Sequence, residues 1–193
     1  MSDFQTVAKA LNEESARRNW RQLCDPSLSF ELPYYNEVIK LWRSKIGTFA
    51  IPKRSDISAR DLKPYLPYIV LMERVRENPS QYRWKIIGTK VAQVIGEHTG
   101  KLFEDSIAPE HLSRWIEHAD TMLAGTQPWR FYGEVMLNGR DYLIGENLYM
   151  PLADDNGQPR FIMALCRYTP GHQDADIQDR IENAMLSEPR GLL

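Results

Sequence analysis

The stretch that decides the fold is WRFYGEVMLNGRDYLIGENLYMPLADDNGQPRFIMALCRY, residues 129–168. Its first nine residues are apolar at every second position except Gly133, which is the period of a half-buried strand. Asn138-Gly139 tolerates positive φ and favours a hairpin turn, and Asp154 to Gly157 supplies a second turn. The segment after that turn is apolar at both parities, as expected of a central strand covered on both faces. The stretch therefore predicts three consecutive strands, 129–137, 142–152 and 161–166.

Two further strands are predicted upstream, over 68–75 and 82–87. The second alternates cleanly, so we expect Tyr82, Trp84 and Ile86 on one face. Neither strand block can form a stable core alone. The five strands are therefore expected to share one antiparallel sheet.

Helices are predicted over 33–46, 90–95 and 109–124. The first has its core face at Tyr35, Val38, Ile39, Trp42 and Ile46. The last carries a continuous apolar stripe, and its polar side, expected to face solvent, holds His111, Arg114 and His118. Residues 2–23 read as weakly helical, either a partly ordered arm or a dimerisation helix.

Composition predicts one domain with appendages, because 193 residues at 42% hydrophobic content can bury one sizeable core. The 24 Lys and Arg against 26 Asp and Glu are interspersed, so no nucleic-acid footprint is expected. Cys24 and Cys166 lie far apart, which predicts free thiols in a reducing compartment. No signal peptide and no membrane span are expected, and we predict a cytoplasmic protein.

The order of elements resembles that of a PAS domain. Local motifs resemble a family of single-domain PAS-like proteins of alphaproteobacteria: Trp42, Gly47, Pro52, Arg54, Asp56, Ile57, Leu62 and Leu66-Pro67, then Gly88-Thr89, Gly96 and Thr99-Gly100-Lys101, and finally Met150-Pro151-Leu152 and Asn156-Gly157. The resemblance implies an α+β fold with a five-stranded antiparallel sheet, helices between strands two and three, and N-terminal helices. It divides the chain into an N-terminal helical extension (1–32), a PAS-like domain (33–168) and a polar C-terminal tail (169–193).

What the resemblance implies for function is a non-enzymatic signalling module. We expect a sensor of a small apolar or aromatic ligand, a protein-interaction adaptor, or both, acting in trans on a signalling protein partner and assembling as a homodimer. The resemblance identifies no cofactor and no catalytic residue. Function on such a fold has to be argued from the site.

Six residues are candidates for lining a ligand pocket: Trp84, His98, Trp115, Phe131, Tyr149 and Cys166. Core packing is the simpler explanation of the aromatic members, and an apolar ligand pocket is the alternative. His98 lies in a loop that relatives place beside their pocket, but the sequence shows no second ligand at a metal- or haem-binding spacing. Cys166 is expected to be a buried structural thiol, because the Asn-Cys-Arg-Phe-Leu context of flavin-binding relatives is absent.

Two other functions stay open. A small isomerase on an α+β cone would need an acid beside Tyr149, and the strand acids available are Glu134, Asp141 and Glu146. A scaffold without a pocket is the other. No metal site is predicted, because His111 and His118 are seven residues apart, too far for one ion on a helix.

Overall fold

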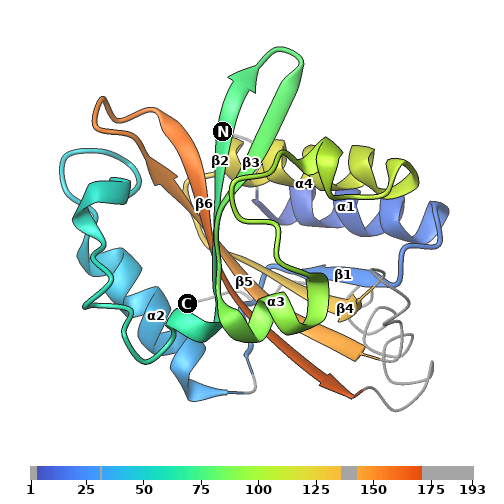
Figure 1. The fold of residues 1–193 in the computed structure, drawn as a ribbon, viewed down its shortest axis with the longest axis horizontal. Helices are drawn as coiled ribbons and strands as arrows, with labels where there is room; N and C mark the ends of the chain where they lie inside the picture. Colours follow the sequence, from blue (N-terminus) through green and yellow to red (C-terminus); the bar gives the residue numbers. More distant parts are fainter. Residues whose placement is uncertain (1–3, 31, 136–142, 171–193) are drawn as a thin grey trace. The chain divides into compact units, whose positions relative to one another are not determined.

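A computed structural model describes residues 4–30, 32–135 and 143–170 (Figure 1). Within these ranges the helices are α1 (Phe4–Arg17), α2 (Pro33–Ser44), α3 (Thr89–Ile95) and α4 (Pro109–Ala124). The strands are β1 (Gln22–Asp25), β2 (Ile69–Glu77), β3 (Ser80–Ile87), β4 (Trp129–Glu134), β5 (Leu143–Ala153) and β6 (Pro159–Pro170). Short 3₁₀ turns occur at Arg54–Asp56, Leu66–Tyr68 and Phe103–Asp105. No helix in the described ranges has the length and apolar character needed to cross a membrane.

The five predicted strands and one more form a single six-stranded sheet, in the order β1-β4-β5-β6-β2-β3. The sixth strand, β1, was not predicted and pairs antiparallel with β4. The described part of the chain divides into two compact units, which are treated separately below. The larger unit comprises 30–129 and 147–167, and the smaller one contains α1, β1 and most of β4.

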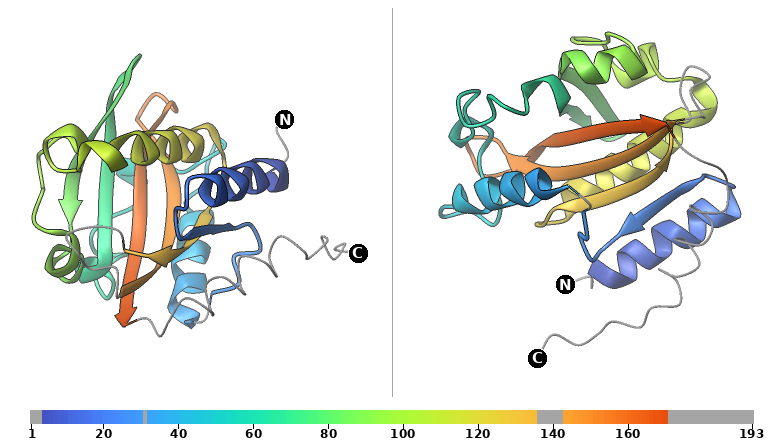
Figure 2. Two further views of the ribbon diagram at one scale, coloured as in Figure 1. Left: turned by 90° about the vertical axis from the view of Figure 1, so that its right-hand side faces the viewer. Right: turned by 90° about the horizontal axis from the view of Figure 1, so that it is seen from below.

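In the larger unit, α2 and α4 lie on opposite sides of the sheet. Figure 1 shows the strands between them, and in the left view of Figure 2 α4 crosses in front of the strands while α2 lies behind. Alternate residues of a strand point to opposite faces. Met72 pairs with Trp84 and defines the inner face, which α4 covers, whereas Leu71 pairs with Met163 and Ile86 on the outer face.

A β-bulge in β3 interrupts the alternation that the sequence predicted. Leu71 pairs with Ile86 but Met72 pairs with Trp84, so Lys85 is the extra residue. Beyond the bulge the strand changes parity. Ile86, predicted to lie on the same face as Trp84, is 42% exposed on the outer face, and Ile87 is buried instead.

The predicted core face of α2 is confirmed except at its end. Tyr35, Val38, Ile39 and Trp42 are all buried. The indole N–H of Trp42 donates to the carbonyl of Pro151 at 3.0 Å, which fixes the helix against the end of β5. The helix ends at Ser44, so Ile46 lies beyond it and is exposed.

The Gly88-Thr89 pair marks a close backbone crossing. Gly88 donates its N–H to the carbonyl of Ile69 at 2.8 Å. A Cβ on Gly88 would lie 2.4 Å from the carbonyl oxygen of Leu66 and 2.5 Å from that of Pro67. Only glycine allows this approach.

The smaller unit joins α1 to β1 through one buried side chain. Asn12 donates from Nδ2 to the carbonyl of Cys24 at 2.9 Å, and its Oδ1 accepts from the Cys24 N–H at 2.7 Å. Residues 22 and 23, predicted as the end of a helix, therefore start a strand. Gly133 interrupts the apolar alternation of β4 because the backbone passes close by, as it does at Gly88. A Cβ on Gly133 would lie 2.2 Å from the carbonyl oxygen of Arg21.

Some predictions fall outside the described residues. These are the Asn138-Gly139 turn, Asp141 and most of the tail. The second turn is confirmed: the carboxylate of Asp154 accepts from the N–H groups of Asn156 and Gln158, at 2.9 and 3.0 Å. The division into 1–32, 33–168 and 169–193 stays a prediction.

Candidate functional site

An aromatic cluster lies between the inner face and α4. The Trp84 and Trp115 rings meet edge to face with centroids 5.5 Å apart, and Phe103 lies 4.5 Å from Trp84 and 6.0 Å from Trp115. The indole N–H of Trp84 donates to Ser106 Oγ at 2.9 Å. Two of the six predicted pocket residues therefore come together, in the edge-on geometry that aromatic pairs prefer.

The hydroxyl of Tyr82 extends this cluster to the middle of α4. It donates to Asp120 Oδ1 at 2.6 Å. Burial and the neighbouring carboxylate raise the pKa of Tyr82, so the phenol stays protonated. The hydrogen bond joins α4 to β3 through an uncharged phenol.

Two polar side chains of α4 face the interior rather than solvent. Arg114 and His118 are one helical turn apart and only 6% and 8% exposed. This corrects the prediction that they lie on the solvated side of the helix. The buried stripe runs through Arg114, His118, Ala119, Met122 and Leu123, so the helix is rotated relative to its predicted apolar stripe.

The protonation states of this pair follow from burial. Desolvation, with a smaller contribution from the positive charge of Arg114, lowers the pKa of His118 to about 3. The imidazole is therefore neutral at physiological pH. Burial also lowers the pKa of Arg114, and the Tyr149 hydroxyl opposes that shift.

Tyr149 on β5 and Cys166 on β6 belong to the same interior. Both are buried. Burial raises the pKa of Tyr149, Cys166 raises it further, and Arg114 lowers it, so these groups are close enough to interact electrostatically. Cys166 is a free cysteine, as predicted, and so is Cys24.

The remaining two candidates have other surroundings. His98 lies after α3, and its Nε2 is 3.0 Å from the carbonyl oxygen of Ile95, so the ring closes the helix end. Phe131 is buried on β4 in the smaller unit, where its register partner is Cys24. His98 is therefore described with α3, and Phe131 with the smaller unit.

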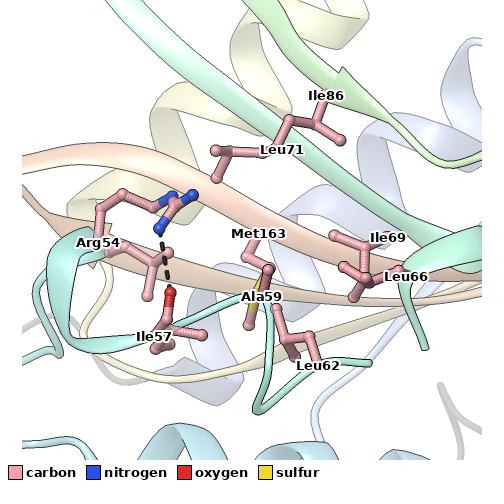
Figure 3. A pocket seen from close by; sticks show the side chains of 10 residues that line it. Arg54, Ile57, Ala59, Leu62, Leu66, Ile69, Leu71, Ile86 and Met163 are labelled. Carbon is pink, nitrogen blue, oxygen red and sulfur yellow. Dashed lines mark hydrogen bonds between the residues drawn. The ribbon is translucent and has the colours of Figure 1, made fainter. Parts of the chain in front are cut away.

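A separate apolar groove lies on the outer face, and it contains none of the six predicted residues (Figure 3). Its cavity volume is about 60 Å³. The lining comes from the 54–66 segment and from β2, β3, β5 and β6: Arg54, Ile57, Ala59, Leu62, Leu66, Ile69, Leu71, Ile86, Leu152 and Met163.

The strand acids required by an isomerase are ion-paired where they are described. Glu134 binds Arg21 at 2.8 Å. Glu146 binds Arg130, which also binds Asp25. Among the described residues no three His, Cys, Asp or Glu side chains are grouped so that they could hold a metal ion.

The family model described as PAS domain matches residues 31–166 of this chain. The chain belongs to the PAS domain family. The match confirms the predicted PAS family and α+β fold, whereas the alphaproteobacterial origin stays a prediction. PAS domains in general are sensory modules of signalling proteins. No curated protein matches the sequence.

Solved structures show only a weak likeness to this PAS domain. A PAS-B domain of Drosophila melanogaster Cycle with bound glycerol is 13% identical with a TM-score of 0.36, covering 52% of this chain and 98% of that one. A sensory box histidine kinase/response regulator from Burkholderia thailandensis is also 13% identical with a TM-score of 0.36, covering 66% and 92%. An RNA-binding light-oxygen-voltage receptor is 10% identical with a TM-score of 0.41, covering 85% and 41%.

Sequence reasoning missed Arg114 and His118 as interior residues. A signal was present, because both lie in register with Met122, at i, i+4 and i+8, on the flank of the apolar stripe. The outer groove had no comparable signal. It arises where the 54–66 connector, which has no periodic pattern, lies over the sheet.

Proposed function

We propose that this PAS domain is a non-enzymatic sensor that binds a small ligand between the inner face of its sheet and α4. The Trp84, Phe103 and Trp115 rings provide the apolar wall, and Arg114, His118 and Tyr149 provide the polar groups that orient the ligand. An apolar lining with a few directed polar groups is characteristic of small-molecule sites.

The observation that supports the proposal most strongly is the burial of Arg114 and His118 on one face of α4. A helix that only covered a sheet would place apolar side chains at both positions, because burying a cation is costly. A neutral histidine beside an arginine offers a ligand both a hydrogen-bonding ring and a positive charge.

The signal leaves the domain through α4 and the sheet. A ligand that binds one packing of α4 on β3 better than another shifts the population between them. The Tyr82–Asp120 hydrogen bond joins the two elements directly and would differ between the packings. We propose that a signalling protein partner in the cytoplasm reads this difference, with the PAS domain acting in trans as a homodimer.

The test is native mass spectrometry of the full chain purified without denaturant. We expect a retained small molecule that is released on unfolding. Arg114→Met should reduce its retention, and Glu117→Gln, which changes an exposed residue of the same helix, should not. Equal retention by both variants would contradict the inner-face site, and a ligand-free protein whose tryptophan fluorescence is unchanged by small-molecule extracts would contradict ligand sensing.

The proposed homodimer is tested with surface substitutions, because a terminal deletion would also remove contacts that hold the fold together. Removing residues 1–25 would delete β1, which pairs with β4, and Asp25, which binds Arg130. Substituting exposed α1 residues, such as Lys9 and Glu13, leaves these contacts in place. Sedimentation of that double variant as a monomer would support an α1 interface, and an unchanged dimer would exclude this face of α1.

A further inference from the structure

The outer groove is apolar over most of its lining and carries a positive charge at one end. Nine of its ten lining residues are apolar and the tenth is Arg54. In Figure 3 the Arg54 guanidinium lies at one end of the groove, and Leu66 and Ile69 lie at the other. The groove therefore joins a cationic end to an apolar body.

Arg54 has no acidic partner among the described residues. Its Nη1 donates to the carbonyl of Ile57 at 3.1 Å, which fixes the side chain over the groove. Glu73, an acid on the same face of β2 as Leu71, is already bound to Lys85 at 3.2 Å and to Arg160 at 2.9 Å. The planar guanidinium retains N–H donors, which suit a carboxylate.

Two side chains that line the groove are exposed to solvent. Leu66 and Ile86, from its two walls, are 38% and 42% exposed. Exposed large aliphatic side chains beside a cavity favour an occupant that buries them. The bulge at Lys85 is the reason that Ile86 reaches this face.

The size of the cavity limits the occupant. About 60 Å³ holds roughly four to six water-sized groups. A row of four to six such groups has the length of a short unbranched alkyl chain. The structure therefore favours a small molecule here.

We propose that the outer groove binds a short-chain aliphatic monocarboxylate, with the chain against Leu71, Ile86 and Met163 and the carboxylate on Arg54. This site is separate from the inner-face site, so the two proposals stand or fall independently. The groove provides both groups that such a ligand needs: apolar side chains for the alkyl chain, and a cation that has no acidic partner among the described residues.

The probe is hexanoate, titrated into full-length protein labelled at Ile, Leu and Met methyl groups and followed by NMR. We expect saturable shifts at Ile57, Ile69, Ile86 and Met163. Hexan-1-ol, which has the same chain without the charge, should bind about tenfold more weakly, because hydrogen bonds to charged groups are the stronger ones. Shifts confined to methyl groups of the inner face, such as that of Met72, or equal affinity for both compounds, would overturn the proposal.

Three variants separate charge from shape. Arg54→Gln should weaken hexanoate about tenfold and leave hexan-1-ol within twofold. Arg60→Gln, an exposed cation of the same segment that does not line the groove, should change neither. Ala59→Leu, at an exposed lining position, should fill the cavity and weaken both compounds. A similar hexanoate loss in Arg54→Gln and Arg60→Gln would show general charge attraction and overturn the site.

Discussion

Arg130 donates from both Nε and Nη2 to a single oxygen of Glu146, at 3.0 and 2.6 Å. Its Nη1 binds Asp25 of β1 at 2.5 Å. All three side chains are at most 13% exposed. One arginine thus neutralises two acids in the interior of the smaller unit.

We predict that Arg130→Met destabilises the protein by about 3–5 kcal/mol, because it leaves the buried carboxylate of Glu146 and the partly buried one of Asp25 without their cation. Urea unfolding measures the effect. Arg21→Met is the matched control: Arg21 is 45% exposed and binds Glu134, so its loss should cost less than about 1 kcal/mol. Similar losses in the two variants would mean that the Arg130 cluster is not buried in solution.

His118 predicts a pH dependence of stability. Its pKa of about 3 in the folded chain lies below its ordinary value of 6.5. Below pH 6.5 the unfolded chain binds a proton that the folded chain excludes, so stability falls as the pH drops toward 3. The slope is at most about 1.4 kcal/mol per pH unit.

His118→Gln should remove this component. Urea unfolding of both proteins at pH 7, 6 and 5 should show the wild type losing more stability on acidification than the variant. The His118 ring resonances should also stay constant over this range. Parallel pH profiles for the two proteins would show that His118 is solvated.

Ile86 and Ile87 form a natural pair for testing the bulge. Ile87 is 6% exposed and Ile86 is 42% exposed. Ile87→Ala should destabilise by about 2–4 kcal/mol through loss of buried volume, and Ile86→Ala by less than about 1 kcal/mol. Thermal unfolding compares them, and the reverse order would place the bulge elsewhere.

Gly88→Ala should be poorly tolerated, because its Cβ would overlap two backbone carbonyl oxygens that cannot move aside as a side chain would. We expect a loss of about 2–3 kcal/mol. Gly47→Ala is the control, since no atom lies within 4 Å of its added Cβ. Calorimetry of the two variants should show a lower Tm for Gly88→Ala only.

The periodic parts of the sequence predicted the fold well. Strands β2 to β6 and helices α2, α3 and α4 lie within a few residues of their predicted ranges. β1 was missed because four residues, Gln22 to Asp25, are too few to show a period, and its pairing depends on Gly133 more than a hundred residues later. The order of these elements along the chain is the order on which the resemblance to a PAS domain was based.

The candidate site was less accessible to sequence reasoning. Trp84 and Trp115 were found because aromatic residues at regular apolar positions can be recognised from the sequence pattern. Arg114 and His118 were assigned to solvent because polarity is normally a good guide to exposure, and here tertiary packing reverses it. The Ile86 error has the same origin, since a single bulge residue changes parity without any mark in the pattern.

The two borders of the sheet are both protected. At one border the last strand is β1, which is only four residues long. At the other, segment 100–102 occupies the middle of β3: Trp84 donates its N–H to Lys101 at 3.0 Å, and Gly100 donates to Trp84 at 2.6 Å. Such borders offer few free backbone groups to an incoming chain, so fibril growth and β-augmentation by a foreign peptide are disfavoured. A binding protein would have to recognise side chains.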